Sequence, residues 1–278
     1  LASKTSPCIE LLPNTLEFGC RCGYPDRNSG MSIDLISLVL ATIMAILRED
    51  TLSSQITQDA LMLLIRQSAV VLLDPRLQAA VVVTDTSLDK LTREQIARAI
   101  NKTAIQAAIS APTHVSVQAL MSLQVQCCVS IGHDDDGTSS GSRLSKVVSK
   151  LMARVLKSEG SRGQHFSSEA FDMEAVLCAI EDALQATESM GKRSSSTCLD
   201  MIKTLLSAII QPSNSSDEVR TVLCDLGMGP SDGALINDVL SSVERDIGIV
   251  PAAVVDGTST ASLRVRENMA PLSDDFSH

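Results

Sequence analysis

Apolar residues recur at spacings of three and four along most of this chain, and no stretch shows a convincing β-strand alternation. Such spacing places the apolar side chains on one face of an α-helix. The sequence therefore predicts an all-α protein. Nine helices are expected, at residues 32–48, 53–73, 93–110, 114–130, 143–157, 172–187, 196–211, 216–226 and 232–247.

The lengths of these helices and the short turns between them favour antiparallel helical pairs stacked in a row, as in a HEAT-repeat solenoid. The apolar stripes are too wide for a strict coiled-coil seam. No repeat is visible by sequence identity, which leaves a compact bundle as the alternative. The core should be aliphatic, because the chain is 44% apolar but has no Trp, one Tyr and four Phe.

Three regions are expected along the chain. Residues 1–30 contain three prolines and three glycines without periodicity, which predicts an irregular arm or linker. Residues 31–247 should form the helical-repeat domain, and residues 248–278 a flexible tail. The sequence begins at Leu1 rather than Met and shows no charged and apolar leader, so we expect a fragment of a longer protein and not a secreted precursor.

Composition excludes several classes of protein. A pI near 4.9, a net charge of −10 and 2% aromatic residues argue against a nucleic-acid binder, which normally carries a basic footprint and stacking rings. No apolar run reaches the roughly 18 residues that a membrane span needs. Most of the eight cysteines lie in helical patterns, which favours reduced thiols and a cytoplasmic protein.

The search for catalytic and metal-binding motifs gives little. Residues 137–141 read GTSSG, which has the letters of a nucleophile elbow, but they lie in a Ser, Gly and Asp run and not after a strand. We therefore expect no enzymatic activity, no cofactor and no metal; a small helical hydrolase using Ser139 is the alternative from another class. Two weaker metal candidates are His133 with Asp134, Asp135 and Asp136, and Cys8 with Cys20 and Cys22.

One predicted helix, over 143–157, has an unusually pure basic face. Its cations recur at spacings of three and four, so they fall within an arc of roughly 80° opposite the apolar residues. A solvated face, or one paired with acidic residues of the following helix, is the common interpretation of such a stripe. The acidic candidates are Glu169, Asp172, Glu174, Glu181 and Asp182. The stripe itself, also a candidate partner-binding site, consists of Arg143, Lys146, Lys150, Arg154 and Lys157.

A succession of segments between residues 31 and 211 resembles a known family. LLDPRL (72–77) is followed by EQIARAINKTAIQAAISAPTHVSVQALMSL (94–123), RLSKVVSKLMARVLKS (143–158), FDMEAVLCAIEDALQA (171–186) and CLDMIKTLLSAII (198–210). This order is similar to the C-terminal, divergent TOG domain of the microtubule polymerase family that includes chTOG, Mini spindles and plant MOR. In that domain too, a Leu-Leu-Asp-x-Arg end precedes a helix with a central Asn, here Asn101.

The resemblance implies HEAT-type helical pairs, no catalysis, and a microtubule-associated role in the cytoplasm, at microtubule ends, spindle poles or other organising centres. It implies partners such as a TACC-type coiled-coil adaptor, the gamma-tubulin complex or the microtubule lattice. The tubulin-capturing TOG domains carry a Trp on an inter-helix loop, and this chain has none. Weak or no binding of the free tubulin dimer is therefore expected. A generic HEAT or armadillo scaffold unrelated to microtubules is the alternative.

Overall fold

A computed structural model describes residues 10–23, 33–73, 87–131, 140–162, 171–188, 190, 192–210 and 216–248. Within these residues the regular structure is entirely helical, which confirms the all-α prediction. The helices are α2 (Leu12–Gly23), α3 (Ile33–Arg48), α4 (Asp50–Ser53), α5 (Gln58–Leu72), α7 (Ser87–Ser110), α8 (Thr113–Ile131), α9 (Ser140–Arg162), α10 (Met173–Glu188), α11 (Lys192–Ile210), α12 (Ser216–Asp225) and α13 (Ile236–Asp246).

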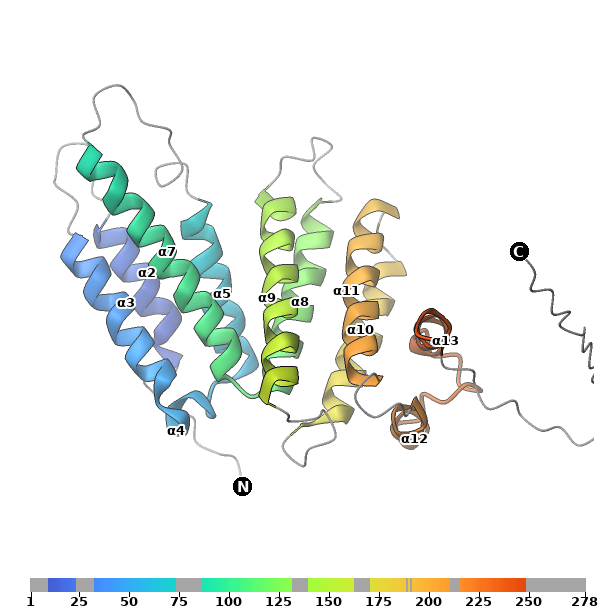
Figure 1. Cartoon of the computed structure of the whole chain (residues 1–278). Coiled ribbons are helices and arrows are strands. Elements are labelled where there is room, and N and C mark those ends of the chain that lie inside the picture. Colours follow the sequence, from blue (N-terminus) through green and yellow to red (C-terminus); the bar gives the residue numbers. More distant parts are fainter. Residues whose placement is uncertain are drawn as a thin grey trace, which may run out of the picture.

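The helices alternate between two layers, shown in Figure 1. The front layer holds α3, α7, α9 and α11, and the back layer holds α2, α5, α8 and α10. Each back helix packs on the front helix that follows it, and each pair also contacts the next pair along the chain. The described helices thus form a row of antiparallel pairs, the arrangement that their lengths and short connections favour.

The last two helices continue this order. Helix α12 packs on α10, and α13 packs on α11 and α10. Both are seen end-on in Figure 1, so they run across the direction of the preceding pairs. The buried carboxylate of Glu181 on α10 accepts hydrogen bonds from the backbone N–H groups of Leu235 (3.2 Å) and Ile236 (3.0 Å), which fixes the start of α13. The segment 216–248 is therefore joined to the row by packing and by buried hydrogen bonds.

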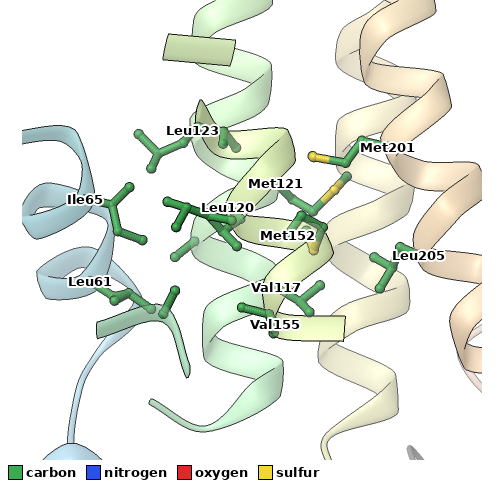
Figure 2. Packing of buried hydrophobic residues seen from close by; sticks show 14 of the residues in the cluster. Leu61, Ile65, Val117, Leu120, Met121, Leu123, Met152, Val155, Met201 and Leu205 are labelled. Atoms are coloured by element: carbon green, nitrogen blue, oxygen red, sulfur yellow. The ribbon is translucent and has the colours of Figure 1, made fainter. Parts of the chain in front are cut away.

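Helix α8 forms the centre of the core. Its sequence has no Asp, Glu, Lys or Arg, and it packs against α5, α9, α10 and α11. A helix that is apolar on most of its sides belongs inside a protein. Figure 2 shows its side chains between those of the neighbouring helices. The labelled residues are Leu61 and Ile65 of α5, Val117, Leu120, Met121 and Leu123 of α8, Met152 and Val155 of α9, and Met201 and Leu205 of α11.

The structure corrects the expectation of an irregular arm at residues 1–30, because α2 lies within that range. Pro13 occupies the first turn of this helix, where a backbone N–H has no partner inside the helix and its loss costs nothing. Leu12 and Leu16 are 4% and 0% exposed, and the helix packs on α3 and α5. Pro13 therefore lies in the first turn of a helix and does not interrupt one. Residues 1–9 and 24–30 lie outside the described residues.

Among the predicted helix boundaries, the starts at residues 53 and 93 differ most from the structure. The helix expected at 53–73 begins only at Gln58, as α5, because Thr57 caps this start by accepting a hydrogen bond from the N–H of Ala60 at 3.3 Å. Residue 53 belongs instead to the end of the short helix α4. Helix α7 begins at Ser87, before the predicted start at residue 93, and its first turns are too polar to show an apolar period. The tail expected at 248–278 lies outside the described residues, apart from Gly248.

Candidate functional site

The five cations of the α9 stripe are all exposed on the front layer. The opposite side of α9 is buried, with Val148, Leu151 and Val155 each no more than 3% exposed. This is the direction that the spacing predicts, since the helical period separates the two faces. The stripe runs from Arg143 to Lys157, which corresponds to roughly 20 Å along the helix axis.

The acidic residues proposed as partners of the stripe lie elsewhere in the structure. Helix α9 packs on α7, α8 and α11, whereas α10 packs on α8 in the back layer. Asp172 caps α10 by accepting from the N–H of Ala175 at 2.9 Å, and Glu181 is bound to the start of α13. Glu169 lies outside the described residues. The pairing of the stripe with these α10 carboxylates is therefore not formed.

Three cations at the middle of the stripe have no partner within the described part of the chain. Lys146, Lys150 and Arg154 make no hydrogen bond or ion pair there and are exposed. Holding them in solvent costs little, because exposed ion pairs are worth only about 0–1 kcal/mol. Their charge is consequently available to a partner of opposite sign.

Neighbouring helices add further cations to the front layer. Arg98 and Lys102 of α7 are exposed, and Lys203 of α11 is half-buried, on helices that contact α9 within the front layer. No sequence signal links these positions to the stripe, because they lie far from it along the chain. The acidic side chains of the same layer include Glu94, paired with Arg98 at 3.3 Å, and Asp200. We call the basic face the set Arg98, Lys102, Arg143, Lys146, Lys150, Arg154, Lys157 and Lys203.

The back layer and α12 carry the opposite charge. Their exposed charged side chains on α5, α10 and α12 include one cation, Arg66. Helix α8 adds no Asp, Glu, Lys or Arg between them. The net charge of −10 is thus distributed unequally over the described surface. The exposed acids are Asp59 of α5, Glu174, Asp182 and Glu188 of α10, and Asp217, Glu218 and Asp225 of α12.

An open groove of about 470 Å³ lies beside the basic face, between α9, α11 and α13. Ala153 and Leu156 line it from α9, adjacent in sequence to Arg154 and Lys157 of the stripe. Lys203 stands at the groove from α11, opposite Asp246 of α13. We call this the front groove; its further lining residues are Thr204, Ser207, Ala208, Val243 and Ile247.

The described residues show no group of three or more His, Cys, Asp or Glu side chains that could hold a metal ion. Burial raises the pKa of Cys127 and of Cys198 to about 12, so both thiols are protonated and inert near neutral pH. None of the helices that the structure describes combines the length and hydropathy needed to cross a bilayer. The motifs based on Ser139, on His133 with its three Asp neighbours, and on Cys8 with Cys20 and Cys22 depend on side chains outside the described part.

Comparison with protein-family models, with curated proteins and with solved structures found no match to this chain. The fold and the surface define an all-α protein of stacked helical pairs with a basic front layer and an acidic back layer. The resemblance to the TOG family therefore depends on the order of its sequence segments alone.

Proposed function

We propose that this chain is a non-catalytic interaction domain that docks an acidic protein partner on its basic face. The observation that carries the proposal is a row of three exposed cations, Lys146, Lys150 and Arg154, which have no partner among the described residues and lie on a helix that also lines the front groove. Charge attracts and orients a partner, and burial of apolar surface then provides affinity. An acidic helix with one apolar stripe matches this combination.

The partner class that we propose is a microtubule assembly. The sequence resembles the C-terminal domain of microtubule polymerases, and the stacked helical pairs agree with the architecture that this resemblance implies. In this role the domain docks a polymerase to partners at microtubule ends or organising centres. A TACC-type coiled-coil adaptor suits the basic face best, because a straight acidic coiled coil can lie along a charged ridge of roughly 20 Å.

Charge reversal on α9 tests the proposal. The triple variant Lys146→Glu, Lys150→Glu, Arg154→Glu should fold normally, because all three side chains are exposed. Its association with a TACC-type coiled coil, followed by stopped-flow fluorescence, should be about tenfold slower at low salt and should lose most of its salt dependence. A matched control is the double variant Arg48→Glu, Arg66→Glu, which reverses exposed cations outside the basic face. The control should associate within about twofold of the wild-type rate.

Three other outcomes are informative. If the folded triple variant associates at the wild-type rate at low and high salt, the basic face is only a solvated surface. If circular dichroism shows that the triple variant unfolds, the stripe is structural. If the wild-type chain binds neither the coiled coil nor stabilised microtubules in cosedimentation, the microtubule assignment is wrong and a HEAT or armadillo scaffold with another partner replaces it.

A further inference from the structure

A second groove, of about 430 Å³, lies on the back layer, over the seam between α8 and α10 and next to the start of α5. It is on the layer opposite the basic face. Asp182 and Cys178 of α10 line it, and Gln118, Ser122 and Gln126 line it from α8. We call this the back groove; the other residues around it are Gln58, Met121, Val125, Ala175, Ala179 and Ala183.

The shape of the back groove follows from small residues on α10. Ala175, Ala179 and Ala183 recur every four residues, so they lie on one face of the helix, and that face has no side chain beyond Cβ. Buried Met121 of α8 lies beside them. The alanines span roughly 12 Å along the axis, which corresponds to about four residues of extended chain at ~3.3 Å each. The groove can therefore hold a short extended segment.

The polar groups around the back groove include three glutamine carbonyl acceptors. The amide nitrogens of the three glutamines donate to groups of this chain: Gln58 to the hydroxyl of Ser122 at 3.1 Å, Gln118 to the carbonyl of Ala175 at 3.2 Å, and Gln126 to the sulfur of Met62 at 3.6 Å. Their carbonyl oxygens accept no hydrogen bond from the residues that the structure describes. Each amide thus offers a carbonyl acceptor to an incoming donor, and its nitrogen keeps a second N–H.

Asp182 gives the back groove a negative charge. Its carboxylate is exposed and has no hydrogen-bond or ion-pair partner in the described ranges. Glu174 and Glu188 are exposed on the same helix. The Asp182 carboxylate together with the glutamine carbonyl oxygens disfavours an acidic ligand and favours one that brings N–H donors and positive charge.

We propose that the back groove binds an extended, Lys- or Arg-rich segment of another protein. The backbone N–H groups of this segment bind the glutamine carbonyls, and one cationic side chain pairs with Asp182. The alanine face accommodates the main chain. This proposal is independent of the function proposed for the basic face, because it concerns the opposite layer, opposite charge and different helices. With both surfaces occupied, the chain would bridge an acidic partner and a basic one.

A matched pair of charge reversals on α10 tests the site. Asp182→Lys changes the charge inside the back groove, and Glu188→Lys makes the same change on the same helix outside it. The probe is a fluorescein-labelled octapeptide of alternating Lys and Ser, with an alternating Glu and Ser peptide as control; binding is followed by anisotropy at low salt. Asp182→Lys should weaken binding about tenfold, and Glu188→Lys by less than about threefold.

A third variant distinguishes peptide binding inside the back groove from nonspecific attraction of the peptide to the negative charge of the surface. Cys178→Tyr adds bulk at an exposed position of the groove without changing charge, so the fold should be retained and binding should fall about tenfold. Equal weakening by the two charge reversals, with no effect of Cys178→Tyr, would show that the peptide binds the negative field and would overturn the proposal. So would a wild-type chain that binds neither peptide. The α9 triple variant should bind the Lys and Ser peptide at least as well as wild type.

Discussion

Arg220 of α12 forms a bidentate ion pair with Glu244 of α13, in which Nε donates to Oε1 at 3.0 Å and Nη2 donates to Oε2 at 2.6 Å. The Glu244 side chain is 1% exposed and that of Arg220 is 27% exposed. A buried carboxylate needs such a partner, because its desolvation is otherwise uncompensated. This pair therefore fixes the last two helices to one another.

Removing the cation should destabilise the C-terminal end of the row. Arg220→Met keeps much of the apolar stem but leaves the Glu244 carboxylate buried and unpaired, at an expected cost of about 2–4 kcal/mol in the free energy of unfolding. Urea denaturation followed by circular dichroism measures this cost. The double variant Arg220→Met, Glu244→Met should recover most of the loss. A single variant as stable as wild type would show that the pair contributes nothing.

Loss of the Glu181 carboxylate should loosen α13. In Glu181→Ala the N–H groups of Leu235 and Ile236 lose their acceptor, which costs about 1–3 kcal/mol for buried donors. Amide hydrogen exchange at these two positions should become faster, whereas exchange in α5 should not change. Glu188→Ala, an exposed site on the same helix, is the control and should leave both regions unchanged. Unchanged exchange in Glu181→Ala would contradict the role of the carboxylate.

The cysteines should differ in reactivity according to burial. At pH 8, a thiol with a pKa of about 12, as for Cys127 and Cys198, is ionised in only about one molecule in ten thousand. Exposed Cys178 and Cys224 should therefore react with iodoacetamide in the folded protein, and buried Cys127 and Cys198 only after urea is added. Peptide mass spectrometry assigns each site. Rapid alkylation of Cys198 in the folded chain would contradict its burial.

The raised pKa values of Cys127 and Cys198 predict that the free energy of unfolding decreases at alkaline pH. Burial is the main cause that raises the pKa of each thiol from its ordinary value of 9.0 to about 12 in the folded chain. Between these values the unfolded chain loses protons that the folded chain keeps, so the free energy of unfolding falls as pH rises. The double variant Cys127→Ala, Cys198→Ala should show a shallower decrease in the urea midpoint from about pH 9 to about pH 11. An equal slope in both proteins would count against this origin.

Free tubulin dimers should bind weakly. Tight interfaces usually contain aromatic anchors in buried pockets, and this chain has no Trp to fill the pocket that the tubulin-capturing TOG domains use. The basic face alone should give only a salt-sensitive association. We expect no saturable complex below about 1 μM at physiological salt in analytical ultracentrifugation. A stoichiometric complex of submicromolar Kd would overturn this expectation and strengthen the case for a tubulin-capturing domain.

The local period of the sequence predicts most helices because residues three and four apart lie on the same face of a helix, and in this chain that face is apolar and buried. The same period fixes the direction of the α9 stripe, since Lys146 and Val148 point to opposite sides of one helix whatever lies next to it. Helix α2 escapes this signal because Pro13 suggests a break, although its place in the first turn permits a helix. The start of α5 at Gln58 is also missed, because apolar residues continue across Thr57 and only the Thr57 cap marks the start.

The neighbours of each helix were decided by tertiary structure alone. Arg98 and Lys203 share the front layer with the stripe because α7 and α11 pack beside α9, and no local pattern encodes this adjacency. Packing also places the α10 carboxylates away from the stripe: Asp182 lines the back groove, and Glu181 is bound to α13. The sequence determined which side of each helix is apolar. The separation of charge between the layers and the position of both grooves depend on which apolar sides meet, and this is set by contacts between residues far apart in the chain.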